Sequence, residues 1–249
     1  MSRLSGKVAV ITGGGRGLGQ AMGLSFAAEG AHVAIFDIDP VTAEDTAARV
    51  REYGVEAHVE IGDLADRAVA QAAIDRVHAR FGRIDVLVNN AMWIRYEPLP
   101  QIAEETVERM LGVGFKAAVW CMQGAVRHLG SGGVVINIAS PAAEVGIGNA
   151  LIYCGIKGAV AAMTRSAAVE LGPRGIRAVA IAPGPIHTEG AGSVVDQKGY
   201  EMRLRKTPLG RLGIPDDVAK AAVFLASDDA AFINGDVIHV DGGATFAFL

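Results

Sequence analysis

Tyr153 and Lys157 lie four residues apart in the segment YCGIK, so a helix there would place both side chains on one face. A tyrosine is a poor proton donor and acceptor at neutral pH, because its reference pKa is about 10. A neighbouring ammonium favours the phenolate and lowers that pKa toward a useful range. The pair therefore indicates general acid–base chemistry, although the same spacing is also typical of a core-edge tyrosine beside a lysine that reaches solvent.

A glycine-rich turn, TGGGRGLG at 12–19, follows the first β-branched run and precedes a helical pattern. Gly13, Gly17 and Gly19 would let backbone N–H groups approach a pyrophosphate, which the positive end of the following helix favours. Asp37 comes about twenty positions later, where a carboxylate can accept hydrogen bonds from both hydroxyls of an adenosine ribose and would repel a 2′-phosphate. These residues predict a dinucleotide site and favour NAD over NADP.

Other interpretations of these residues stay open. Arg16 lies beside the glycine turn, and its guanidinium could pair with a 2′-phosphate. Asp37 could simply begin a turn. Asp63 follows the third predicted strand and could either cap the next helix or hold the edge of an adenine. Asn89 and Asn90 close the fourth predicted strand, where ligands of such sheets usually bind.

Short apolar runs alternate along the chain with longer segments of helical periodicity. The predicted strands are 7–11, 31–36, 57–61, 84–88, 133–139, 176–182 and 236–240, and the predicted helices are 17–29, 41–53, 66–81, 103–129, 151–171 and 216–226. Runs that are apolar almost throughout are typical of strands buried on both faces. The alternation predicts the α/β class: a single Rossmann domain over residues 1–249, with a doubly wound, mostly parallel seven-stranded sheet and helices on both faces.

Composition limits the classes of function. The chain has 249 residues, 51% apolar and 20% charged, and its net charge of −4 comes without a basic stripe, so we expect no nucleic-acid partner. No apolar run reaches about 18 residues, and Lys7 and Arg16 interrupt the first one, so we expect neither a membrane span nor a secretory leader. Cys121 and Cys154 form no C-x-x-C pair, which is typical of a reducing compartment. We therefore expect a cytoplasmic protein.

Several motifs occur together in a characteristic order. They are TGGGRGLG, NNA at 89–91, Ser140, YCGIK, IAPGPIHT at 181–188 and the tail from 211 to 243. In order and spacing the chain resembles the short-chain dehydrogenase/reductase superfamily in its compact single-domain form, over nearly its whole length. The resemblance implies hydride transfer to or from a carbonyl carbon. Enoyl reductases of this superfamily carry a wider gap between the tyrosine and the lysine, so the spacing disfavours them.

The resemblance also implies roles for individual residues. Tyr153 matches the catalytic acid and base, Lys157 the residue that lowers the tyrosine pKa and hydrogen-bonds the nicotinamide ribose, and Ser140 the residue that positions the substrate oxygen. The implied cofactor contacts beyond Tyr153, Lys157 and Asp37 are Gly13, Gly17, Leu18, Gly19, Asp63, Leu64, Asn90, Ala91, Pro183, Ile186 and Thr188. A homotetramer is implied as well.

Two positions near the predicted site depart from the superfamily pattern. Met92 stands where the segment NNA is usually followed by glycine. Gly114, in the middle of the helix predicted over 103–129, stands where the superfamily has the asparagine that completes the catalytic tetrad and holds a water beside the lysine. Either water in the vacated space still links Lys157 to solvent, or proton transfer is impaired.

The predicted substrate pocket combines the segments after the fourth, fifth and sixth strands. Its expected lining residues are Met92, Trp93, Glu144, Asn149 and His187, with residues 189–210 as a lid. This lining favours a largely apolar small molecule. His187 has no partner at metal-ligand spacing, so we expect no metal.

The sequence as a whole predicts an oxidoreductase that transfers a hydride between NAD(H) and a secondary alcohol or ketone. Two alternatives remain. One is an NADPH-linked 3-oxoacyl carrier reductase, which Asp37 argues against. The other is a dinucleotide-sensing protein with impaired catalysis, which Gly114 and Met92 leave open.

Overall fold

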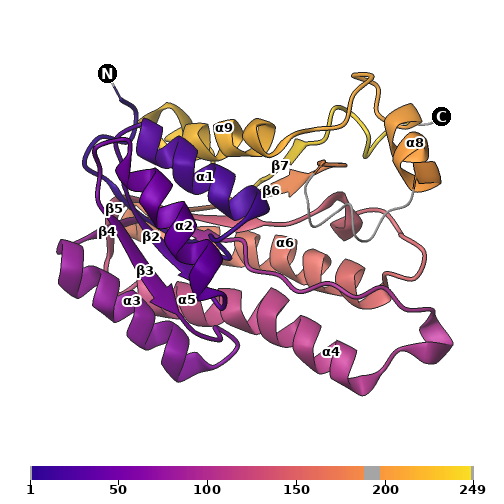
Figure 1. Cartoon of the computed structure of the whole chain (residues 1–249), viewed down its shortest axis with the longest axis horizontal. Helices are drawn as coiled ribbons and strands as arrows, with labels where there is room; N and C mark the ends of the chain where they lie inside the picture. The colour runs from indigo at the N-terminus through magenta and orange to yellow at the C-terminus, as the bar shows by residue number, and fades with distance from the viewer. Residues whose placement is uncertain (1, 188–196, 248–249) are drawn as a thin grey trace.

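The computed structural model describes residues 2–187 and 197–247 and contains one seven-stranded sheet, as Figure 1 shows. The strands are β1 Val8–Thr12, β2 His32–Asp37, β3 Ala57–Ile61, β4 Ile84–Asn89, β5 Leu129–Ile138, β6 Arg177–Pro183 and β7 Val237–Val240. The α-helices are α1 Gly17–Ala28, α2 Pro40–Arg51, α3 Arg67–Phe81, α4 Glu104–Leu111, α5 Ala117–Ala125, α6 Leu151–Leu171, α8 Gln197–Arg205 and α9 Pro215–Ala226. No helix in these residues is long and apolar enough to cross a bilayer.

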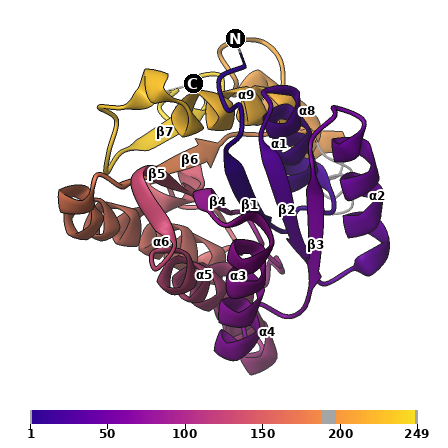
Figure 2. The same cartoon turned by 90° about the vertical axis from the view of Figure 1, so that its left-hand side faces the viewer.

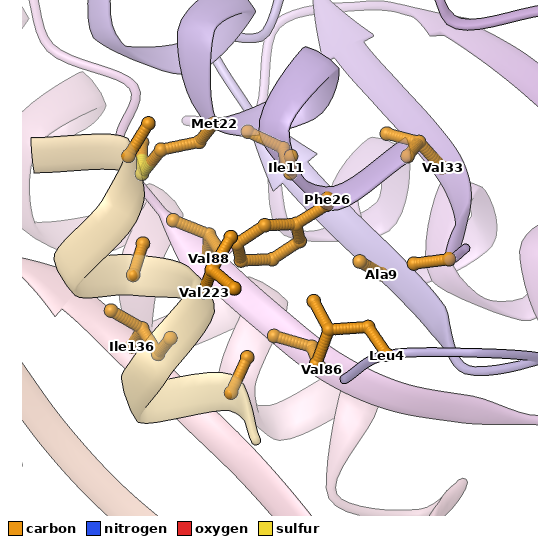
Figure 3. Packing of buried hydrophobic residues seen from close by; sticks show 14 of the residues in the cluster. Leu4, Ala9, Ile11, Met22, Phe26, Val33, Val86, Val88, Ile136 and Val223 are labelled. Carbon is orange, nitrogen blue, oxygen red and sulfur yellow. The ribbon is translucent and has the colours of Figure 1, made fainter. Parts of the chain in front are cut away.

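Helices cover both faces of the sheet, because its strands are apolar on both sides. Figure 2 shows α1, α2 and α9 on one face and α3, α5 and α6 on the other. The core under the first group gathers around Phe26, which packs among Ile11, Val88 and Val223 in Figure 3. The second core joins α3, α5 and the end of α6 to the opposite face of the same strands.

All strand pairs are parallel, in the order β3-β2-β1-β4-β5-β6-β7. Every strand therefore ends at the same edge of the sheet. From β1 the chain adds β2 and β3 on one side of the sheet, and from β4 it adds β5, β6 and β7 on the other side. This reversal of strand order leaves a crevice beyond the carboxyl ends of β1 and β4. The predicted α/β class, the parallel sheet and the two helical layers are confirmed.

The predicted elements agree with the structure to within two residues at each end, apart from one region. The single helix predicted over 103–129 is wrong in two respects. A π-helical turn, Gly112–Lys116, separates α4 from α5, and α5 ends at Ala125. Leu129 instead begins β5 and pairs with Ile84. An apolar residue at a helical interval can equally belong to the next strand, because periodicity alone does not separate the two.

Candidate active site

Ser140, Tyr153 and Lys157 come together beyond the carboxyl end of β5. Ser140 follows β5 by two residues and begins a 3₁₀ turn, where its Oγ accepts a hydrogen bond from the Ala142 N–H at 3.2 Å. The same hydroxyl hydrogen-bonds Tyr153 on the first turn of α6. One turn later, Lys157 Nζ lies 5.7 Å from the centroid of the Tyr153 ring. The three residues thus form one cluster, which has the composition that acid–base chemistry at a carbonyl or hydroxyl requires.

The Lys157 side chain is buried between α6 and the sheet. Only 5% of its surface is exposed, and its ammonium donates a hydrogen bond to the Ile138 carbonyl oxygen at 2.7 Å. Burial disfavours the charged form and lowers the pKa of Lys157 to about 8. Near neutral pH the group therefore still carries its positive charge, beside the phenol that it is expected to activate.

A second tyrosine, for which the sequence carried no motif, packs against Tyr153. The ring of Tyr96 stands edge-on against Tyr153, with centroids 5.8 Å apart. Burial raises the pKa of Tyr153 to about 12, while its hydrogen bond with Ser140 acts in the opposite direction. Burial also raises the pKa of Tyr96. Tyr96 has no motif spacing, so only its place after β4, in the expected pocket segment, could have suggested it.

The burial of Lys157 predicts a pH-dependent stability. Between pH 8 and 10.5 the unfolded chain keeps a lysine proton that the folded protein has released, so the unfolding free energy rises with pH in this window. Relative to Lys157→Met, we expect the unmodified protein to gain up to roughly 3 kcal/mol between pH 7.5 and 10.5. Urea unfolding of the cofactor-free proteins measures this. In the control comparison, the unmodified protein should show no such gain relative to Lys220→Met, which changes an exposed lysine. If the unfolding free energies of the unmodified protein and of Lys157→Met changed in parallel with pH, the prediction would be contradicted.

The glycine turn between β1 and α1 is shaped for close backbone approach. Gly13 has a φ of 62°, and a Cβ on Gly19 would overlap the Gly13 carbonyl oxygen. Asn90 holds the turn from β4, since its Nδ2 donates to the carbonyl oxygens of Thr12 at 2.9 Å and Gly13 at 3.0 Å. Leu18 turns its side chain into the core and leaves only its backbone at the turn. A pyrophosphate fits such a cradle of backbone groups at a helix N-terminus.

The carboxylate of Asp37, at the end of β2, accepts hydrogen bonds from three nearby backbone N–H groups. One carboxylate oxygen accepts from the Gly15 N–H at 2.9 Å, and the other from the N–H groups of Ile38 at 2.8 Å and Asp39 at 3.1 Å. The interpretation of Asp37 as a turn-forming residue is therefore correct. Oδ2, which accepts only from the Gly15 N–H, keeps a second lone pair for a ribose hydroxyl, whereas Oδ1 already accepts two hydrogen bonds. Arg16 is exposed at the start of α1, and its guanidinium has no ion pair with any described residue.

The remaining predicted cofactor residues line the same edge. Asp63 accepts from the Ala65 N–H at 2.9 Å, whereas Asp66 caps α3, so the interpretation of Asp63 as the helix cap is wrong. Leu64 is buried beside it. The other positions are Ala91, whose N–H donates to Thr12 Oγ1 at 3.0 Å, Pro183 at the end of β6, and Ile186, which forms a β-bridge with Gly213. Thr188 lies outside the described residues.

Met92 and Gly114, the two departures from the superfamily pattern, are in contact. A Cβ added to Gly114 would lie 2.5 Å from Met92 Sδ and 3.0 Å from Ile156 Cγ2. Met92, in the loop after β4, thus occupies the space that a side chain at position 114 would need. A cavity of about 10 Å³ remains next to Gly114, against Lys157. Met92 and Gly114 therefore pack against each other, so the two departures from the superfamily pattern depend on one another sterically.

The expected pocket residues do not all face an open site. The indole of Trp93 lies under the guanidinium groups of Arg109, at 4.2 Å, and Arg95, at 5.3 Å. Glu144 meets His239 of β7, with 3.2 Å between Oε1 and Nε2. Asn149 has a left-handed backbone with a φ of 61°. His187 is exposed, and the predicted lid contains α8, while residues 188–196 are outside the described part of the chain.

Comparison with known proteins agrees with this geometry. Residues 13–245 match the family described as Enoyl-(Acyl carrier protein) reductase, although the four-residue spacing of Tyr153 and Lys157 disfavours that reaction. D-threitol dehydrogenase of Mycolicibacterium smegmatis is 37% identical, covering 98% of this chain and 94% of its own. A short chain dehydrogenase from Burkholderia cenocepacia in complex with NADP has a TM-score of 0.92 and 33% identity over 97% of this chain and 99% of its own. A 7 alpha-hydroxysteroid dehydrogenase complexed with NADH and 7-oxo glycochenodeoxycholic acid has a TM-score of 0.93 and 32% identity over 97% and 95%.

These matches span nearly the whole chain at more than 30% identity. The chain belongs to the short-chain dehydrogenase/reductase superfamily, in its single-domain form. It is therefore an NAD(P)-dependent oxidoreductase of that superfamily. One of these relatives is in complex with NADH and another with NADP, so the similarity does not determine which of the two cofactors this chain prefers.

Proposed function

We propose that this protein transfers a hydride between NAD(H) and a secondary alcohol or ketone, with Tyr153 as the acid and base. The observation that carries the proposal is the Ser140–Tyr153–Lys157 cluster at the crevice of the sheet. The Ser140 hydroxyl bonds the phenol, and the buried Lys157 ammonium lies beside the same ring. The threitol and hydroxysteroid dehydrogenases support an alcohol as the substrate class.

In this proposal each side chain has a separate task. The Tyr153 phenol holds the proton that the substrate oxygen gains in reduction, and as phenolate it takes that proton in oxidation. The Ser140 hydroxyl donates to the same substrate oxygen and stabilises its developing negative charge. The Lys157 ammonium stabilises the phenolate, which opposes the effect of burial on the Tyr153 pKa. Tyr96 packs edge-on against the Tyr153 ring and so helps to fix the orientation of that ring.

The cofactor fits the residues at the other half of the crevice. The backbone of the turn from Gly13 to Gly19 would hold the pyrophosphate, and Asp37 the adenosine ribose. A bound nicotinamide supplies or takes up the hydride. We infer a preference for NAD because a carboxylate at position 37 repels a 2′-phosphate, whereas Arg16 lies at the surface beside the turn.

Initial rates of NAD⁺ and NADP⁺ reduction over a panel of polyols, cyclic secondary alcohols and 3-hydroxyacyl thioesters test the proposal. We expect NADH formation with at least one secondary alcohol, and kcat/KM for NAD⁺ at least about tenfold above that for NADP⁺. Asp37→Asn removes the repelling charge and should reduce this ratio about tenfold or more. Asp45→Asn, an exposed carboxylate on α2, is the control and should leave the ratio unchanged.

Other outcomes separate the alternatives. Turnover confined to NADPH and 3-oxoacyl thioesters would establish the carrier reductase instead. Tight cofactor binding without turnover on any alcohol or ketone would favour a dinucleotide sensor, in line with the altered positions Met92 and Gly114. An Asp37→Asn protein with an unchanged cofactor ratio would overturn the assigned role of Asp37.

A further inference from the structure

Arg203 brings a positive charge from α8 to the two tyrosines of the site. In Figure 1 this helix lies beyond the carboxyl ends of β6 and β7. Arg203 is half-buried. Burial raises the pKa of Tyr153 and of Tyr96, and the charge of Arg203 acts in the opposite direction on both. The guanidinium therefore lies near both phenols, because the interaction between charges weakens with distance and is screened by water.

The end of α8 is anchored to the sheet, which fixes the place of Arg203. The Arg203 carbonyl oxygen accepts from the hydroxyl of the buried Thr207 at 2.8 Å. The Thr207 carbonyl oxygen in turn accepts from the Gly210 N–H at 2.9 Å, and the Leu209 N–H donates to the carbonyl oxygen of Gly242, just beyond β7, at 3.2 Å. These bonds use only the backbone of Arg203, so its guanidinium is left for another partner.

No carboxylate of the chain neutralises this guanidinium within residues 2–187 and 197–247. Two acidic side chains of the pocket segments have other partners. Glu144 meets His239, with 3.2 Å between Oε1 and Nε2, and Glu97 accepts from the Ala103 N–H at 3.3 Å. A half-buried cation without a counter-ion is suited to binding an anion, because a charge removed from water is stabilised by an opposite charge.

Tyr96 places an uncharged donor beside the same charge. Its ring stands edge-on against that of Tyr153, with 5.8 Å between the centroids. Burial raises the pKa of Tyr96, so its hydroxyl keeps its proton and can donate a hydrogen bond. Arg203 and Tyr96 together thus present donors next to the proposed acid and base. The complementary ligand is one that only accepts hydrogen bonds and carries a negative charge.

We propose that Arg203 and Tyr96 bind a carboxylate of the substrate, so that the substrates of this protein are hydroxy acids and the corresponding oxo acids. The planar guanidinium matches the two oxygens of a carboxylate, and the Tyr96 hydroxyl donates a further hydrogen bond. A single cation suits a single negative charge. It does not suit a phosphate chain, which carries several.

This inference rests on the proposed oxidoreductase function and narrows its substrate class. In the oxidation of a hydroxy acid, the hydroxyl proton passes to the phenolate of Tyr153 and the hydride passes from the same carbon to NAD⁺. The product is an oxo acid, and the carboxylate is unchanged. Arg203 and Tyr96 therefore hold the substrate and take no proton from it.

The other arginines near the site provide the contrast that a test needs. Arg95 and Arg109 are exposed, and both stack on the indole of Trp93. Arg205 is exposed and lies two residues after Arg203 on α8. Residues two apart on a helix do not share a face, so Arg205 is the matched control for Arg203.

Calorimetric titration of the protein–NADH complex tests the carboxylate site without turnover. The probes are 3-, 4- and 5-hydroxy acids and their primary amides, which are not oxidised because the cofactor is already reduced. We expect at least one acid to bind about tenfold or more tightly than its amide. Arg203→Met should reduce that preference about tenfold or more, whereas Arg205→Met should leave it unchanged.

Three results would overturn the proposal. The first is equal binding of every acid and its amide, and the second is a preference for the acid that survives in Arg203→Met. The third is a loss of NADH affinity in Arg203→Met that exceeds the loss of hydroxy-acid affinity, since Arg203 would then bind the phosphates of the cofactor. Each is measured on the complete chain with its cofactor.

Rates with NAD⁺ separate this inference from the proposed function. The ratio of kcat/KM for the best acid to kcat/KM for its amide should fall about tenfold or more in Arg203→Met and by less in Tyr96→Phe, which keeps the ring and the guanidinium. Oxidation of neutral alcohols without any preference for acids would overturn the carboxylate site and leave the proposed function intact. Preferential binding of acids without turnover would overturn the proposed function and leave the carboxylate site intact.

Discussion

Replacing Tyr153 by phenylalanine is expected to lower kcat by about 10²–10⁴-fold while changing NADH affinity by less than about threefold. The substitution removes the hydroxyl that exchanges the proton and keeps the ring that packs against Tyr96. Ser140 and Lys157 remain in place, so the loss reports proton transfer rather than the collapse of the cluster. Initial rates with the best alcohol of the panel measure the first effect, and NADH fluorescence titration measures the second.

Tyr53→Phe is the matched control, since it removes the hydroxyl of an exposed tyrosine just beyond the end of α2. Its rates should equal those of the unmodified protein. If Tyr153→Phe kept more than about a tenth of the turnover, Tyr153 would not be the acid and base, because such a group contributes at least about 10²-fold. Loss of NADH binding together with turnover would point instead to a structural role for the phenol.

The sheet was predictable because each strand carries its own signal. Runs such as Val33–Phe36 are apolar on both faces, and their alternation with helical segments specifies a parallel sheet before any contact is known. The break in the helix over 103–129 was visible only as two glycines. A π-helical turn there depends on how α4 and α5 pack on α6 and α3, and local propensity does not contain that information.

The candidate site was predictable to the extent that it follows motifs. The order of the glycine turn, Ser140 and the Tyr153–Lys157 pair indicated which residues would meet at the carboxyl edge, and the structure does bring them there. The contact of Tyr96 with Tyr153 carries no spacing signal, because it arises from packing between distant segments. The pairing of Glu144 with His239 joins residues nearly a hundred positions apart in the same way.

The contact between Met92 and Gly114 predicts a strong coupling between these two positions. Gly114→Asn alone should lower the unfolding free energy by about 1–3 kcal/mol, because its Cβ would lie 2.5 Å from Met92 Sδ and 3.0 Å from Ile156 Cγ2. Met92→Gly alone should lower it by about 2–4 kcal/mol, through the space that the lost side chain leaves. Urea unfolding of both proteins measures the two changes.

The double variant Met92→Gly with Gly114→Asn should recover about 1–3 kcal/mol relative to the sum of the single changes, since the asparagine then enters the space that methionine has left. The same cycle measured on kcat asks whether an asparagine at this position improves turnover once methionine no longer blocks it. Gly23→Ala, on α1, is the control, because an added Cβ there would lie no closer than 3.7 Å to its nearest neighbour. Its effect on the unfolding free energy should add to that of Met92→Gly without coupling.

Additive effects at Met92 and Gly114 would mean that the two departures from the superfamily pattern are independent. A coupled pair would mean that this chain has exchanged a side chain from the helix for one from the loop after β4, so that the effect of Gly114→Asn alone says little about proton transfer.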